Sequence, residues 1–109
     1  MTFMKVAEES EIPVGGMKAV KLGDLNVLIA NVNGSYYAIG SVCTHRNGDL
    51  SKGTLEGNTV TCPNHKAKFD VTTGRVVSGP KVPLMHPKIK EEPAYTVKVE
   101  GKDILLEQP

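Results

Sequence analysis

Apolar residues along this chain alternate with polar ones at a period of two, which is the pattern of β-strands. The longest apolar stretch, Val27-Leu28-Ile29-Ala30-Asn31-Val32, is nearly continuous and is typical of a strand buried on both faces. Asn33-Gly34 follows it. This dipeptide favours the type I′ turn of a two-residue hairpin, because both central residues of that turn need a positive φ. We therefore expect residues 35–39 to form the partner strand.

Two further hairpins are predicted by the same alternation, each with a glycine-containing turn. Their strands and turns are Met17–Leu22, Gly23-Asp24 and a strand beginning at Leu25, then Tyr95–Glu100, Gly101-Lys102 and Asp103–Leu106. No segment keeps a helical period for long, and a short helical turn at Glu8–Glu11 has little support in the pattern. The predicted fold class is all-β: an antiparallel sandwich or barrel of about eight to ten short strands.

Length and charge narrow the class of protein. The 109 residues suit a single domain, residues 1–109, with one modest core. A hydrophobic share of 39% excludes intrinsic disorder, and a net charge of +1 argues against nucleic-acid binding. The sequence contains no run of about 18 apolar residues, no secretory signal and no lipidation motif. We therefore expect no membrane association and a cytoplasmic location, where disulfides are rare.

The pattern changes between about residues 41 and 92. Predicted strands become short there, glycines cluster, and both cysteines and all three histidines occur in this stretch. We interpret it as a small subdomain that is inserted into base sheets formed by about residues 1–40 and 93–109.

Two short segments carry the candidate chemistry: Cys43-Thr44-His45 and, after sixteen intervening residues, Cys62-Pro63-Asn64-His65. Two sulfur and two nitrogen donors suit a structural zinc ion or an iron–sulfur centre. Zinc fingers of the Cys₂His₂ type pair cysteine with cysteine, whereas each segment here contains one Cys and one His. The spacing therefore favours a binuclear cluster. A mononuclear zinc site, a disulfide and two buried core cysteines are the alternatives.

This two-part motif resembles that of the Rieske-type ferredoxins, small 2Fe–2S electron carriers, and the resemblance covers nearly the whole chain. Further matching segments are Phe69-Asp70, Thr73-Gly74 and Gly79-Pro80. The resemblance implies three stacked antiparallel sheets, a cluster-binding subdomain and one 2Fe–2S cluster per chain. It also implies that Cys43 and Cys62 bind the buried iron, and that His45 and His65 bind the outer iron and form the electron exit.

Four positions depart from the high-potential members of that family. Gly48 and Asn64 stand where those members have the two cysteines of a disulfide. Ala67 and Phe69 stand where they have a serine and a tyrosine hydroxyl beside the cluster. Because hydrogen bonds to cluster sulfurs raise the reduction potential, the resemblance implies a low-potential protein, at about −150 mV rather than about +300 mV.

Charges around such a cluster matter because its own charge is small. Two ferric ions, two sulfides, two thiolates and two neutral imidazoles sum to zero, and one added electron makes the total −1. Arg46, Lys66 and Lys68 would lie near the histidines. They either guide an acidic partner or form no more than a solvated face.

The leading functional interpretation is a non-enzymatic carrier that takes one electron from a ferredoxin reductase and passes it to a terminal oxygenase or other acceptor. The sequence has no nucleophile–base pair, phosphate loop or dinucleotide fingerprint, and we expect a monomer. A second interpretation is a small iron–sulfur subunit of an oxidoreductase complex, of the oxygenase or nitrite reductase type, and a third is a redox or iron sensor. We expect His86 to be a surface or packing residue, Asp70 to cap the turn before Gly74, and Gly79-Pro80 to cover the cluster.

Overall fold

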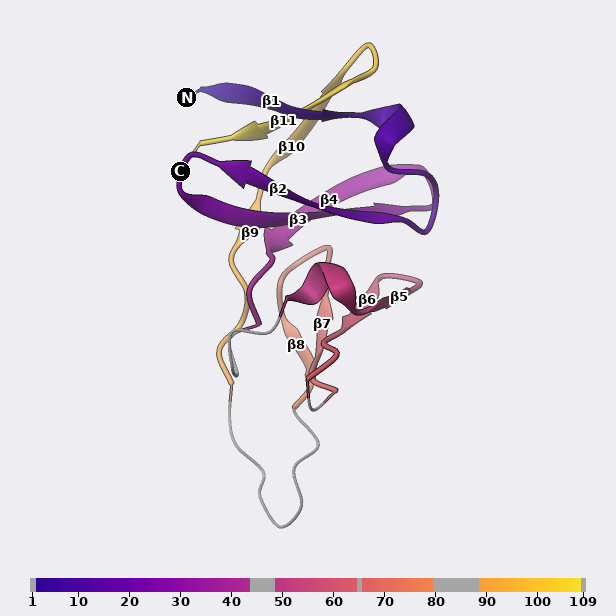
Figure 1. Ribbon diagram of the computed structural model, residues 1–109, viewed down its shortest axis with the longest axis vertical. Helices are drawn as coiled ribbons and strands as arrows, with labels where there is room; N and C mark the ends of the chain where they lie inside the picture. Colours follow the sequence, from indigo (N-terminus) through magenta and orange to yellow (C-terminus); the bar gives the residue numbers. More distant parts are fainter. Residues whose placement is uncertain (1, 44–48, 65, 80–88, 109) are drawn as a thin grey trace.

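A computed structural model describes residues 2–43, 49–64, 66–79 and 89–108 of the chain, and Figure 1 shows its ribbon. The described residues form strands and two short 3₁₀ helices, η1 and η2. In chain order these are β1 (Phe3–Glu8), η1 (Glu9–Glu11), β2 (Met17–Leu22), β3 (Leu25–Val32), β4 (Ser35–Gly40), η2 (Leu50–Lys52), β5 (Thr54–Glu56), β6 (Thr59–Thr61), β7 (Lys68–Asp70), β8 (Val76–Ser78), β9 (Ala94–Tyr95), β10 (Val97–Glu100) and β11 (Asp103–Glu107).

The strands form three antiparallel sheets, as the resemblance implies, and the all-β fold class is confirmed. The sheet orders are β1-β11-β10, β2-β3-β4-β9 and β5-β6-β7-β8. The estimate of eight to ten strands was too low, because the described residues contain eleven. β1 was not among the predicted strands, and the three-residue strands β5–β8 are too short to show a clear alternation.

The middle sheet, β2-β3-β4-β9, has a core on each of its faces. Leu28 and Ala30 of β3 pack into the core shared with β5–β8, whereas Val27 and Ile29 pack into the core shared with β1 and β11. All four side chains are fully buried. Successive residues of a strand face opposite sides, so one strand can serve two cores. The predicted burial of β3 on both faces is therefore confirmed, and Figure 1 shows this sheet between the other two.

The predicted two-residue turns are also present. Asn33 and Gly34 both have positive φ, +54° and +93°, as a type I′ turn requires. Leu22 pairs with Leu25 around the first hairpin turn, and the β10–β11 turn is equally short. The β2–β3 and β3–β4 hairpins bring these three strands together through contacts between neighbouring segments of the chain.

The expected single strand at residues 95–100 is wrong. Its first part belongs to β9, which pairs with β4 in the middle sheet, and its second part is β10, which pairs with β11. The chain passes from one sheet to the other at Thr96, whose carbonyl accepts from the Glu107 N–H at 3.1 Å. Alternation of side chains continues through this point, so the sequence pattern contains no sign of the change of partner.

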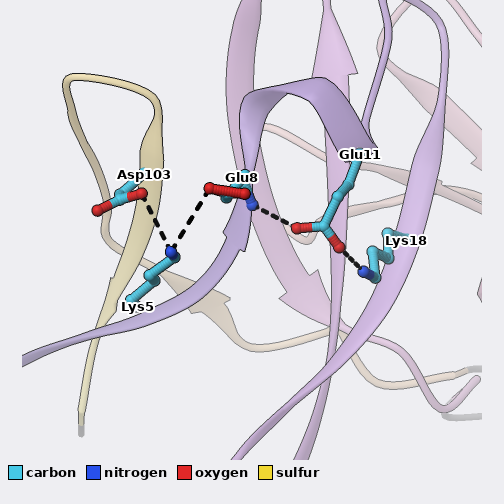
Figure 2. Close-up of polar contacts among 5 residues, drawn as sticks. All are labelled: Lys5, Glu8, Glu11, Lys18 and Asp103. Carbon is cyan, nitrogen blue, oxygen red and sulfur yellow. Dashed lines mark hydrogen bonds and ion pairs between the residues drawn. The ribbon is translucent and has the colours of Figure 1, made fainter.

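Polar side chains at the protein surface form hydrogen bonds and ion pairs around η1, as Figure 2 shows. The Glu8 N–H donates to the Glu11 carboxylate at 2.7 Å in a capping box, and Glu11 also pairs with Lys18 of β2. Lys5 of β1 lies 3.7 Å from Glu8 and 3.2 Å from Asp103 of β11. Because these pairs are exposed and screened by solvent, each contributes little to stability. The capping box accounts for the helical turn that the hydrophobic pattern supported only weakly.

Gly53 gives a test of how tightly the β5–β8 subdomain is packed. A Cβ added to Gly53 would lie 1.9 Å from the carbonyl oxygen of Thr61, the residue before Cys62. We expect Gly53→Ala to lower the free energy of unfolding by about 1–3 kcal/mol, the usual cost of overpacking, measured by urea denaturation. Gly57→Ala is the control, because Gly57 has open space around it and only its φ of +60° opposes a side chain, at about 1 kcal/mol. Equal stability of Gly53→Ala and the wild type would contradict the close approach.

Candidate metal centre

Cys43 lies at the base of a loop that follows β4. The Leu50 N–H donates to the Ser41 carbonyl at 2.8 Å, and Val42 forms an antiparallel bridge with Asp49. These contacts bring the two ends of the loop together next to Cys43. Its side chain is 1% exposed, so the sulfur lies in the protein core rather than on the loop surface.

Cys62 occupies the equivalent place in a second loop, directly after β6. Its N–H donates to the Ala67 carbonyl at 2.7 Å, which closes the loop just before β7 begins. Lys66 has a φ of +63°, a left-handed conformation that is uncommon for residues other than glycine. It allows the chain to turn back towards Ala67, which is buried, as is Cys62.

Both cysteines belong to one core cluster, together with Leu50, Val60 and Phe69. They are free thiols, so the disulfide alternative is wrong for this structure. Burial raises the pKa of the Cys62 thiol to about 11, and the neighbouring Cys43 thiol adds to this shift, while a hydrogen bond from the Asn64 backbone N–H opposes it. Two buried sulfur atoms thus lie side by side, ready to share one soft metal ion once they lose their protons.

The structure places only part of the predicted site. His45 and His65 lie outside the described residues, as do Arg46, Gly48, Pro80 and His86. Within the described residues no group of three or more His, Cys, Asp or Glu side chains is arranged to bind a metal. Of the predicted ligand set the structure therefore describes only the two cysteines, whose common core is compatible with a shared metal.

Asp70 has the structural role that the sequence predicts. Its carboxylate accepts from the backbone N–H and hydroxyl of Thr72 at 2.8 and 2.6 Å, and its carbonyl accepts from the Gly74 N–H at 2.7 Å. These bonds build the turn between β7 and β8. Asp70 therefore stabilises this turn through its hydrogen bonds to Thr72 and Gly74.

Two predicted departures from high-potential relatives have clear positions. Ala67 and Phe69 are both fully buried in the core that contains the cysteines. Neither side chain has a hydroxyl that could donate to sulfur. Lys66 is exposed and Lys68 is half-buried in β7, so Lys66 is the more accessible of the two cations to a partner.

One buried residue that affects Cys62 was not predicted from the sequence. Glu92 is 5% exposed, and its carboxylate also raises the pKa of Cys62. In the sequence it is the second member of a Glu-Glu pair before Pro93, in a stretch that contains no hydrophobic alternation. Nothing in that pattern distinguishes it from the exposed Glu91.

Comparison with known proteins gives a consistent result over nearly the whole chain. The family model described as Rieske [2Fe-2S] domain matches residues 2–88. The biphenyl dioxygenase ferredoxin subunit of Pseudomonas sp. (strain KKS102) is 37% identical over 108 residues, which are 98% of this chain and 93% of that protein. The ferredoxin component of the naphthalene 1,2-dioxygenase/salicylate 5-hydroxylase systems of Ralstonia sp. is 34% identical over 96 residues, 88% of this chain and 86% of that protein.

A solved structure shows the same arrangement of sheets. The ferredoxin of carbazole 1,9a-dioxygenase from Nocardioides aromaticivorans IC177 matches with a TM-score of 0.81 at 29% identity, over 97% of each chain. In the part of our chain that the structure describes, no helix is long and apolar enough to cross a membrane.

The buried Cys62 thiol leads to a pH prediction for the metal-free protein. Folding raises its pKa from 9.0 to about 11, so the folded protein holds this proton more tightly than the unfolded chain does. Its contribution to stability is therefore constant below pH 9 and is lost as the pH rises towards 11. We expect the carbon-13 NMR shift of the Cys62 Cβ atom, followed through a pH titration, to reach half of its total change near pH 11 in the folded protein.

The urea-unfolded chain is the control, and its midpoint should lie near pH 9, where an exposed thiol titrates. The same midpoint in both states would contradict the burial of this thiol.

Proposed function

The chain belongs to the Rieske [2Fe-2S] domain family, and from this premise we propose that it is a one-electron carrier that takes electrons from a ferredoxin reductase and passes them to a terminal oxygenase. The observation that carries the proposal is the pair of buried thiols, Cys43 and Cys62, which two separate loops bring into one core. The relatives that match nearly full length are named as ferredoxin components of dioxygenase systems.

We assign the ligands as the sequence motif suggests: Cys43 and Cys62 to one iron, and His45 and His65 to the other. The adjacent sulfur atoms support the first half of this assignment. The histidine half rests on the spacing of the motif, C-x-H and C-x-x-H. Residues 41–92 would then be the cluster-binding subdomain, and residues 1–40 and 93–109 its base.

The cluster supplies the redox chemistry when it is bound: it accepts one electron and returns it without any change in the covalent structure of the polypeptide. The chain's own residues set its surroundings. Buried Ala67 and Phe69 offer no hydroxyl to the sulfurs, and the Asn64 backbone N–H is a donor to Cys62. The missing hydroxyl donors support a potential at the low end of the Rieske range, about −150 mV, whereas the Asn64 N–H acts in the opposite direction.

The carrier interpretation is favoured over a small subunit of a larger enzyme. The chain covers 93% and 86% of two relatives that are named as a dioxygenase ferredoxin subunit and a ferredoxin component. We propose that it is a monomer without a substrate site of its own, and that the exposed Lys66, with Arg46 and Lys68, guides an acidic redox partner. Gel filtration distinguishes the two interpretations, because a free carrier elutes near 11.7 kDa.

The direct test of the function combines cofactor and electron transfer. The purified protein is analysed for iron and sulfide, reduced with dithionite, and examined by EPR. Two irons, two sulfides and a rhombic signal with a lower average g than all-cysteine clusters give would support the proposal. The reduced protein is then mixed with the oxygenase component of a naphthalene dioxygenase system, and its oxidised spectrum should return. One zinc per chain with a silent spectrum would overturn the electron-carrier function.

Ligand variants test the four assigned residues. Cys43→Ser, Cys62→Ser, His45→Ala and His65→Ala should each reduce the iron content from two per chain towards zero and abolish the EPR signal, because each removes one of four ligands. His86→Ala is the matched control, since the third histidine is outside the motif and should leave both readouts unchanged. Full iron content in any ligand variant, or its loss in the His86 variant, would contradict the assignment.

A further inference from the structure

The turn between β3 and β4 contains a dipeptide, Asn33-Gly34, that is prone to a chemical change. The backbone nitrogen of Gly34 can attack the side-chain amide carbon of Asn33, because glycine has no side chain to hinder the approach. Both residues are exposed, so water and base reach them. The reaction, deamidation, converts asparagine into aspartate or isoaspartate.

Deamidation proceeds through a cyclic imide and needs no oxidant or reductant. The Gly34 nitrogen first loses its proton, and it then bonds to Cγ of Asn33 while the bond from Cγ to Nδ2 breaks and ammonia leaves. Water opens the imide at either carbonyl, which restores the N–H and gives aspartate or isoaspartate. The first requirement is therefore a Gly34 N–H that is free to lose its proton.

In this structure that N–H is bound by a side chain of β3. It donates to Oδ1 of Asn31 at 2.9 Å. The same Asn31 side chain donates through Nδ2 to the Ile12 carbonyl, also at 2.9 Å. An N–H on one side and a carbonyl on the other determine which end of the amide is oxygen, so the acceptor faces Gly34.

Asn31 is held in place by further contacts outside the turn. Its side chain is 3% exposed. Its backbone N–H donates to the Gly16 carbonyl at 3.0 Å, and its carbonyl accepts from the Gly15 N–H at 2.9 Å. Hydrogen bonds of a buried amide are stronger than those in water, because the local dielectric constant is low. Asn31 is therefore a fixed acceptor for the Gly34 N–H.

The equivalent amides of two other turns have no such acceptor. Asp24 and Lys102 occupy the position of Gly34 in the β2–β3 and β10–β11 turns, which also contain two residues. In the part of the chain that the structure describes, neither backbone N–H donates a hydrogen bond. The bond at Gly34 therefore comes from Asn31 and is not a general property of these turns.

We propose that Asn33 is a deamidation site and that Asn31 protects it, by binding the Gly34 amide proton that the reaction must remove. The protection matters because isoaspartate inserts an extra carbon into the backbone of a turn that has only two residues. Such an insertion disturbs the register of β3 and β4. Since β3 packs into both cores, the change would also reach the core that contains Cys43 and Cys62.

The first test uses the unmodified, cluster-loaded protein. Base-catalysed exchange of an amide hydrogen requires the same loss of a proton from nitrogen, so exchange rates measured by NMR report this step directly. After correction for the intrinsic rate of each residue type, the Gly34 amide should exchange roughly tenfold more slowly than those of Asp24 and Lys102, the factor expected for one hydrogen bond. Equal corrected rates would overturn the inference.

The second test measures deamidation itself. The protein is incubated in mildly alkaline buffer, and peptide mapping by mass spectrometry follows the mass gain at Asn33. Fragmentation distinguishes this site from the second Asn-Gly dipeptide of the chain, Asn47-Gly48. Asn31→Val removes the acceptor with a side chain that suits a strand. We expect the deamidation rate at Asn33 to rise roughly tenfold in this variant, because the Gly34 N–H is then free.

Val27→Ala is the control for a general loss of stability. Val27 is fully buried at the other end of β3, so its truncation weakens the same sheet but leaves Asn31 and the turn unchanged. Its deamidation rate at Asn33 should stay near that of the wild type. An unchanged rate in Asn31→Val would overturn the inference. An equal rise in both variants would also overturn it, because unfolding would then control the reaction. If Asn31→Val does not fold, the exchange rates of the unmodified protein decide.

Discussion

Alternate residues of β3 pack into opposite cores, and through them a single strand positions both of the other sheets. Val27 and Ile29 bury the face that meets β1 and β11, while Leu28 and Ala30 bury the face that meets the cysteine core. Full burial of a Val, Leu or Ile side chain stabilises a protein by about 1.5–3 kcal/mol, and three such residues in a row, Val27, Leu28 and Ile29, act on both interfaces. The site therefore depends also on Val27 and Ile29, which lie on the far face of the sheet that borders it.

Burial of the cysteines defines the chemistry of the site. A core that raises the pKa of Cys62 to about 11 keeps the metal-free thiol neutral at physiological pH, so iron must displace protons in order to bind. The same core excludes water and gives distant charges a longer reach than they would have in solvent. Ala67 and Phe69 supply no hydroxyl donor in this environment.

The sequence predicted those parts of the fold that are encoded locally. The β2–β3–β4 hairpins follow from alternation and from the turn at Asn33-Gly34, and the family from the spacing of the two Cys/His segments. The change of sheet at Thr96 was not predictable, because alternation records which face a side chain occupies and not which strand lies beside it. The burial of Glu92 was equally hidden, since it depends on the space left by Gly40 and Gly74, both distant in sequence. His45 and His65 lie outside the described residues, and their assignment stays a prediction.

The locality of the central hairpins also bears on the order in which the protein is assembled. The pairings of β2 with β3 and of β3 with β4 close across turns of only two residues, and contacts between near neighbours in a chain form quickly. None of these pairings involves a cysteine or a histidine. The β2–β3–β4 part of the middle sheet can therefore form in the newly synthesised chain before iron binds, and it provides one side of the cysteine core. Binding of the cluster would then complete a core that is already partly formed, rather than direct the folding of the whole chain around a metal.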